Sequence, residues 1–216
     1  MFRSFGIILV LIGFVLPEFQ PCLAQGRGGL SSGWGGVDLL LNPVVQKELG
    51  LDDAATRRAI DLAETLQDRQ RVIFGKLEGL AGDERTRKAH ELAREHATDG
   101  LKAVQALLPP DQFERFRQID LQQRGASALV DPLVIGALQL STVQVDQVQG
   151  LLDRSVLKFR EALSNTRSDR RTSAEKIQVV RTDLNAQAVN LLTEPQKARW
   201  NEMIGRPINL GSTGRP

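Results

Sequence analysis

The chain has 216 residues and a formal net charge of +2, with 41 % apolar and 25 % charged residues. This is the composition of an ordinary globular protein, and the near balance of charge argues against a nucleic-acid-binding function. One cysteine and two histidines cannot form an intramolecular disulfide or a closed zinc site of His and Cys ligands within one chain, and we expect no cofactor.

The first 24 residues have the features of a secretory signal. Arg3 precedes a run of ten apolar residues, 7–16, and Pro17 ends that run. Cys22 and Ala24 are the small residues expected just before a cleavage site. Ten apolar residues are too few for a transmembrane helix, which needs about 20, and no later segment approaches that length. The sequence therefore predicts cleavage near Ala24 and a periplasmic or secreted bacterial protein with no membrane span.

Cys22 also permits a second interpretation, in which its thiol is lipidated rather than removed. The two positions that usually hold Leu and a small residue in a lipidation signal hold Phe19 and Pro21 here. We therefore favour simple cleavage. The mature chain then contains no thiol, which suits an oxidising compartment such as the periplasm.

Segments at the two ends of the mature chain have the composition of flexible linkers. The segment 25–41 begins with a Gly- and Ser-rich run, and 205–216 is rich in Gly and Pro, so we expect a flexible lead-in and a flexible tail. Trp34 lies in the lead-in. It is either an anchor for a partner or an incidental packing residue, and we favour the second interpretation.

Apolar residues recur at helical spacing in four long stretches, 60–80, 89–108, 145–163 and 177–191. A spacing of three or four residues, or a multiple of it, is typical of amphipathic helices, and no sustained alternating run predicts a strand. Polar turns separate the stretches in pairs, which favours antiparallel helical hairpins. The predicted fold class is all-α.

The second part of the chain repeats the first. Asn42-Pro43 recurs as Asp131-Pro132, and Phe116 corresponds to Trp200. We therefore predict a first helical unit, 42–124, and a second helical unit, 125–204, each with helices in the order short, long, long, short. We expect the two units to pack around one composite core with pseudo-twofold symmetry. The protein is then either a monomer with two dimer-like halves or a homodimer.

Related pentapeptides stand at all four predicted helix junctions. Leu192–Gln196 has the pattern L-T-x-x-Q and Leu140–Gln144 has L-S-x-x-Q; Leu108–Gln112 keeps the Leu and Gln ends, and Leu51–Ala55 keeps the Leu with a capping Asp. Thr or Ser followed three residues later by Gln is a capping box, in which each residue bonds the backbone N–H of the other. The predicted helix-capping residues are Leu108, Gln112, Leu140, Ser141, Gln144, Leu192, Thr193 and Gln196. Their role is architectural.

These pentapeptides, together with the secretory signal, resemble the LTxxQ-motif family of Spy/CpxP-like periplasmic proteins. The resemblance covers both helical units and implies an exported, all-α protein built of curved helical hairpins. Some members of that family are ATP-independent chaperones that hold unfolded clients on a cationic and apolar surface. Others restrain envelope-stress sensor kinases, and one branch responds to metal ions. The familiar members of that family carry one hairpin unit per chain and dimerise, whereas this chain carries two.

The sequence does not favour a metal site or an active site. His90 and His96 lie six residues apart, whereas two ligands on one helix normally lie three or four apart. The clusters of His, Cys and Met residues that mark the metal-responsive branch have no counterpart here. None of the common catalytic motifs is present, so we expect no enzyme activity and no catalytic residue.

Arginine pairs recur along the predicted hairpins. Arg57-Arg58, Arg69 with Arg71, Arg85 with Arg87, and Arg170-Arg171 are such pairs. The simpler interpretation is a solvated face paired with nearby acids such as Asp61, Asp68 and Glu84. The alternative is a cationic surface, interleaved with apolar groups, that attracts acidic unfolded segments.

The sequence thus leads to a binding hypothesis. We expect an exported, ATP-independent protein that binds unfolded or stress-exposed envelope proteins. The alternatives are an envelope-stress or metal-responsive regulator of a membrane signalling partner, and a structural helical protein of the envelope. The sequence assigns no particular residues to client binding.

Overall fold

The computed structural model describes residues 36–164 and 170–210, except for the side chains of residues 90, 163–164 and 170–173. These residues belong to one compact unit, Ser31–Pro216. Within the described ranges the regular structure is entirely helical, with eight α-helices, two 3-10 helices and no strand. The predicted all-α fold class is therefore confirmed. The predicted secretory signal, Cys22 and Trp34 lie outside the described residues.

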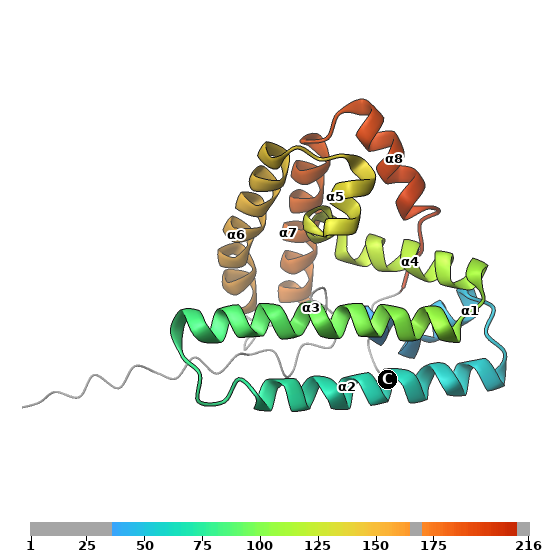
Figure 1. Cartoon of the computed structure of the whole chain (residues 1–216). Helices are drawn as coiled ribbons and strands as arrows, with labels where there is room; N and C mark the ends of the chain where they lie inside the picture. The colour runs from blue at the N-terminus through green and yellow to red at the C-terminus, as the bar shows by residue number, and fades with distance from the viewer. Residues whose placement is uncertain (1–35, 165–169, 211–216) are drawn as a thin grey trace, which may run out of the picture. The chain divides into compact units, whose positions relative to one another are not determined.

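The chain enters the first helical unit through a 3-10 helix, η2 (Val37–Leu41). It continues through α1 (Pro43–Glu48), α2 (Asp53–Gly75), α3 (Gly82–Leu107) and α4 (Pro110–Arg124). N-cap side chains fix two of the helix starts: Asn42 Oδ1 accepts the Val44 N–H at 2.8 Å, and Asp52 Oδ1 accepts the Ala55 N–H at 2.7 Å. The long helices α2 and α3 lie side by side and antiparallel (Figure 1).

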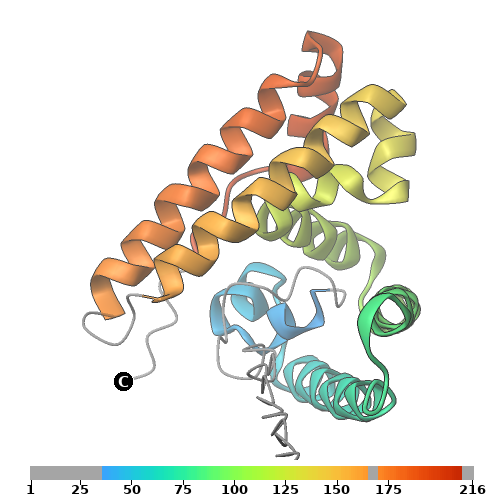
Figure 2. The same ribbon diagram turned by 90° about the vertical axis from the view of Figure 1, so that its left-hand side faces the viewer.

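The second helical unit also begins with a 3-10 helix, η3 (Gly125–Val130). It continues through α5 (Pro132–Leu138), α6 (Thr142–Ser164), α7 (Arg170–Asn190) and α8 (Glu194–Ile204). The side chain of Asp131 caps α5 by accepting the Leu133 N–H at 2.9 Å. Helices α6 and α7 form an antiparallel pair, which is clear in both ribbon views (Figures 1 and 2). Each unit therefore has two short helices flanking two long ones.

Apolar burial divides into two main clusters rather than the one composite core that we expected. The first cluster is built from η2 and α1 to α4, and the second from α4 to α8 together with η3. Val37 and Leu40 of η2 pack in the first cluster, and Ala128 and Leu129 of η3 pack in the second. A 3-10 segment and two short helices thus cover part of the apolar face of each hairpin, and this reduces the apolar area that the other hairpin must cover.

The described parts of both predicted flexible segments pack against helices, whereas residues 25–35 and 211–216 lie outside the described residues. Residues 37–41 of the lead-in form η2, in which Leu40 is fully buried. Residues 205–210 of the tail lie beside α4, where the Gln122 side chain bonds their backbone, and Ile208 and Leu210 pack against the first cluster. Aliphatic side chains are buried in η2 and half-buried in 205–210, and this packing outweighs the local Gly and Pro content on which the expectation of flexibility rested.

None of the described helices combines the length and apolar character that crossing a membrane requires.

Candidate binding surface and helix junctions

The four pentapeptides lie at helix junctions: α1 to α2, α3 to α4, α5 to α6, and α7 to α8. Their second residues stand just before the helices, and three of them, Asp52, Ser141 and Thr193, have side chains that cap. The fourth, Pro109, makes no side-chain cap bond. Leu108, Leu140 and Leu192 are buried, so the Leu position of the pattern contributes to the cores.

Capping boxes close at both junctions of the second helical unit. The Ser141 N–H donates to Gln144 Oε1 at 3.0 Å, and the Gln144 N–H donates to Ser141 Oγ at 3.2 Å. Thr193 and Gln196 form the equivalent box, in which the Thr193 N–H donates to Gln196 Oε1 at 2.9 Å. These bonds satisfy backbone N–H groups that a helix start leaves without partners.

The two box glutamines also bond one another, which the sequence did not predict. Gln144 Nε2 donates to Gln196 Oε1 at 2.7 Å, and Gln196 Nε2 lies 3.2 Å from Gln144 Oε1. Each amide further reaches the helix end beside the other junction: Gln144 Nε2 donates to the Leu191 carbonyl at 2.9 Å, and Gln196 Nε2 to the Leu138 carbonyl at 3.2 Å. We call this pair of side chains the glutamine clasp.

The first helical unit has no equivalent of the clasp. Ala55 stands where Gln144 stands in the second unit, and it has no side-chain amide. Gln112 is half-buried in the first turn of α4, and the N-cap residue of that helix, Pro109, makes no side-chain cap bond. The pattern of Leu and Gln residues therefore marks three of the four junctions, and it builds the same bonding arrangement at only two of them.

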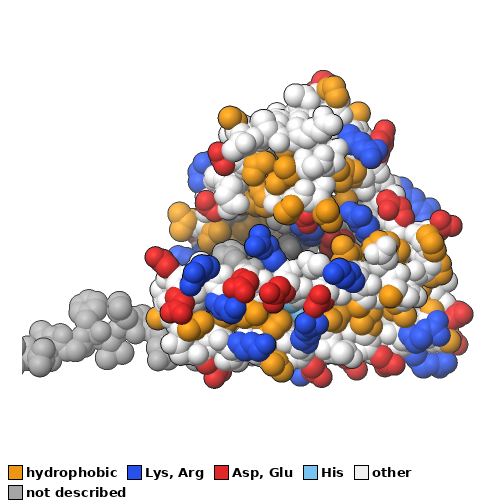
Figure 3. All heavy atoms as spheres, viewed as in Figure 1, with side chains coloured by type: hydrophobic (Ala, Val, Ile, Leu, Met, Phe, Trp, Pro, Cys, Tyr) orange, Lys and Arg blue, Asp and Glu red, His pale blue; other side chains and the backbone are white. Residues whose placement is uncertain are grey.

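Large apolar side chains are exposed on the α6–α7 hairpin. Of the seven large hydrophobic residues exposed in the described part of the chain, Val143, Val156 and Leu157 are on α6 and Val179 is on α7. Leu157 and Val179 are 64 % and 68 % exposed. On the face drawn in Figure 3, apolar side chains gather over the part of the molecule that holds α5, α6 and α7, whereas α3 presents mainly charged groups.

Charged side chains accompany these apolar groups. Arg154 and Lys158 are exposed on α6, and Lys158 Nζ lies 3.3 Å from Asp183 Oδ2 on α7. Hydrogen bonds from Gln187 and Lys158 lower the pKa of Asp183, so its carboxylate is charged at neutral pH. The hairpin therefore offers exposed aliphatic groups next to cations, and this combination can contact apolar and acidic parts of another chain.

Several arginines of the predicted pairs form ion pairs or hydrogen bonds with other groups of the same chain. Arg69 of α2 forms an ion pair with Asp99 of α3 at 2.7 Å, and Arg85 donates to the Leu77 carbonyl in the turn between the two helices at 2.7 Å. Arg71 pairs with Asp68 on the same helix. For Arg69 and Arg71 the simpler interpretation, a solvated face with acidic partners, matches the contacts, whereas Arg85 is half-buried and bonds backbone carbonyls instead. The side chains of Arg170 and Arg171 lie outside the described set.

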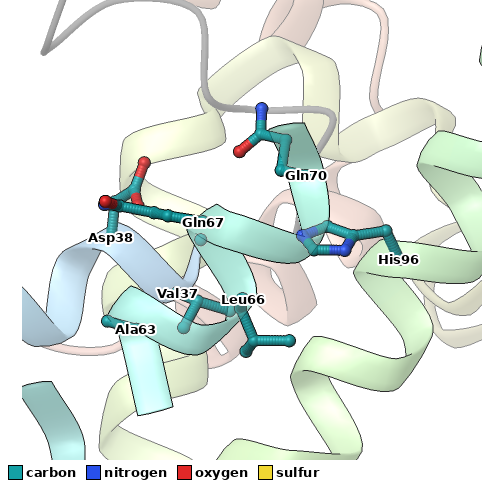
Figure 4. Close-up of a pocket in the computed structure, with 8 residues that line it drawn as sticks. Val37, Asp38, Ala63, Leu66, Gln67, Gln70 and His96 are labelled. Atoms are coloured by element: carbon teal, nitrogen blue, oxygen red, sulfur yellow. The ribbon is translucent and has the colours of Figure 1, made fainter. Parts of the chain in front are cut away.

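His96 of α3 is buried against α2 and is only 2 % exposed. Burial lowers the pKa of His96, the charge of Arg69 lowers it further, and Asp99 and Asp38 oppose the shift. Its ring borders a cavity of about 10 Å³ that Gln67 and Gln70 also line (Figure 4). That volume is enough for about one water molecule, so the cavity is too small for an organic ligand.

The described residues contain no group of three or more His, Cys, Asp or Glu side chains arranged to hold a metal ion. Comparison with protein-family models gives no match, and comparisons with curated proteins and with solved structures give no significant similarity.

Proposed function

We propose that this chain is an exported, ATP-independent protein of the Spy/CpxP-like kind, and that it binds unfolded or stress-exposed envelope proteins in the periplasm. The observation that carries the proposal is the exposure of Val156, Leu157 and Val179 on the α6–α7 hairpin. An exposed aliphatic group gains free energy when an unfolded chain covers it, about 25 cal/mol for each Å² of apolar area removed from water. Several such groups on one hairpin give weak, reversible binding without ATP.

The glutamine clasp supports the same proposal because it fixes the hairpin that carries the exposed apolar side chains. It bonds the start of α6 to the end of α7, so the base of the hairpin is held by side-chain hydrogen bonds between Gln144, Gln196 and the Leu191 carbonyl. A hairpin that is fixed at its base can leave apolar side chains exposed along its length without closing on itself. The exposed groups then remain available to a client.

We also propose that the two helical units are copies related by pseudo-twofold symmetry, and that together they replace the two subunits of a family dimer. The order short, long, long, short in 43–124 and again in 132–204 supports this, as do the matching caps at Asn42 and Asp131. The protein purified from residue 25 onward is then a monomer at micromolar concentration. Multi-angle light scattering measures this mass directly, and a dimer mass contradicts the proposal.

Light scattering from an aggregating client tests the binding function. We expect the protein, equimolar with a chemically unfolded client, to reduce the scattering at low salt. The effect should weaken as salt screens the attraction between the hairpin cations and acidic client segments. Unchanged aggregation at low salt would reject client binding. Micromolar binding of zinc, copper or nickel in calorimetry would instead favour the metal-responsive alternative.

A further inference from the structure

The last described residues of the chain form an extended strap. Residues 205–210, here called the C-terminal strap, follow α8 without regular secondary structure and lie beside α4 at Gln122, crossing that helix in the view of Figure 1. Ile208 and Leu210 are half-buried and pack against the apolar cluster of the first helical unit, whereas Pro207 and Asn209 between and before them are exposed. This alternation is that of an extended peptide with one face bound.

Gln122 of α4 bonds the backbone of the strap. Its Nε2 donates to the Arg206 carbonyl at 2.8 Å, and its Oε1 accepts the Ile208 N–H at 3.0 Å. These two backbone groups flank Pro207 and point to the same edge of the extended chain, so one amide side chain does what a neighbouring β-strand would do. Because both bonds are to backbone, Gln122 can hold any extended segment of suitable shape. Proline at the position between them is tolerated, since its missing N–H is not used.

Glu48 gives this contact a preference for a positively charged side chain in the bound segment. Its Oε1 lies 2.6 Å from Arg206 of the strap and 2.8 Å from Arg115 of α4. Burial raises the pKa of Glu48, but the hydrogen bonds and charges of Arg115 and Arg206 outweigh that effect and leave the pKa below its ordinary value. Glu48 is therefore an anion that Arg115 holds in place. Arg206 is 71 % exposed, so its ion pair selects a basic residue more than it adds affinity.

We propose that Glu48, Gln122 and the apolar edge that Ile208 and Leu210 contact form a peptide-binding site, which the strap occupies within its own chain. The partner that this site fits is an extended segment of an unfolded protein with a basic residue followed by aliphatic residues two and four positions later. The strap has this pattern in Arg206, Ile208 and Leu210. That the partner is a client protein rests on the proposed function. The proposal adds the kind of client segment that the site recognises.

The strap acts as an internal competitor for that site. A segment tethered close to its site is present at an effective concentration of about millimolar, so a free peptide binds only to the fraction of molecules whose strap is released. Loosening the strap should therefore increase the affinity for a free peptide without any change to the site.

Fluorescence anisotropy of a labelled peptide with the sequence of residues 204–210 tests the proposal on the full-length chain. We expect Ile208→Ser/Leu210→Ser to bind the peptide at least about tenfold more tightly than the wild type does. Adding Gln122→Ala to that variant should remove the gain. A peptide in which Ser replaces the Ile and Leu that correspond to Ile208 and Leu210 is the matched control, and it should not bind.

Circular dichroism establishes that each variant keeps its helices. If the double serine variant loses helix content, the milder Arg206→Glu, which places a negative charge beside Glu48, replaces it under the same criteria. A folded variant that binds the peptide no more tightly than the wild type, or a gain that survives Gln122→Ala, overturns the proposal. Client aggregation is measured separately: peptide binding without suppression of aggregation leaves the site in place and rejects only the proposed function.

Discussion

Gln144 and Gln196 bond to each other at the base of the α6–α7 hairpin, with Gln144 Nε2 2.7 Å from Gln196 Oε1. Each glutamine also closes the capping box of its own helix and donates to a backbone carbonyl beside the other junction. The Gln of the pentapeptide therefore has two functions, since it caps one helix and ties two junctions together. The Leu138 and Leu191 carbonyls, which helix ends leave without intrahelical partners, obtain donors in this way.

The hydrogen bonds of the clasp should appear as a coupling free energy between Gln144 and Gln196 in a double-mutant cycle of unfolding. Gln144→Ala and Gln196→Ala each leave the other amide and a carbonyl short of a partner, and each should lower the free energy of unfolding by about 1–3 kcal/mol. The double variant should lose less than the sum of the two, with a coupling of at least about 0.5 kcal/mol. Urea unfolding measures all three. Gln112→Ala, at the corresponding position of α4, is the control and should cost less than either; additive losses would show that the two amides act independently.

The capping box at α8 predicts a smaller and separate effect. Thr193→Ala removes the hydroxyl that bonds the first turn of α8 and should cost about 1 kcal/mol of stability. Thr193→Ser keeps the hydroxyl and should retain most of that stability. The same urea experiment compares the two variants. A loss of only a few tenths of a kcal/mol for Thr193→Ala would mean that the box contributes little.

His96 predicts how stability changes with pH. Burial and Arg69 lower its pKa in the folded protein, so the unfolded chain, with a His pKa of about 6.5, binds the proton more readily. The stability associated with His96 is then full above about pH 6.5 and is lost as the pH falls through that value toward the folded pKa. Thermal unfolding from pH 8 to pH 5 measures this loss.

His96→Gln, which does not titrate, is the control for that experiment. Burial raises the pKa of Asp120, so its contribution has the opposite sign and is lost as the pH rises. Asp120 titrates in both proteins, and the difference between the two pH profiles therefore isolates His96. Parallel profiles for the wild type and His96→Gln would contradict the assignment.

Gly205 should be required where α8 ends and the strap begins. Its backbone has φ 60° and ψ −157°, a region that only glycine adopts readily, and a Cβ built there would lie 2.2 Å from the Gln118 side-chain oxygen. Gly205→Ala should therefore cost about 1–3 kcal/mol and increase hydrogen exchange in residues 205–210. Gly136→Ala, in an exposed turn of α5 with no atom near the added methyl, should be neutral or slightly stabilising. Equal effects of the two changes would remove the special role of Gly205.

The sequence predicted the helices well because their information is local. Apolar spacing located the four long helices, and Asn42, Asp131 and Thr193 marked helix starts through caps that need only nearby residues. The separate apolar clusters were missed, since η2 and η3, with five and six residues, are too short to show a helical period. Long-range bonds were missed for a different reason: nothing in the spacing of Gln122 or Gln144 shows which distant carbonyl its amide reaches.

The candidate binding surface was only partly predictable. The hypothesis of a cationic and apolar surface named no residue, because a single sequence does not distinguish a buried apolar position from an exposed one at the edge of a stripe. Arg69 and Arg85 were possible surface cations, yet both are occupied by contacts within the α2–α3 hairpin. Val156 stands at helical spacing from Leu152 and Phe159 and is nevertheless 52 % exposed, and the exposed Leu157 lies one residue off that spacing.

The most direct test of the account compares client aggregation in the presence of three proteins. These are the wild type, the variant Val156→Ser/Leu157→Ser/Val179→Ser, and a control with Val44→Ser/Val72→Ser/Leu133→Ser, whose side chains are 40–63 % exposed on other helices. Exposed substitutions of this kind change stability little, by about 0.5 kcal/mol each. We predict that the α6–α7 variant must be at least about tenfold more concentrated than the wild type to suppress aggregation equally, whereas the control matches the wild type. Equal suppression by both variants, or none by the wild type, would contradict the account.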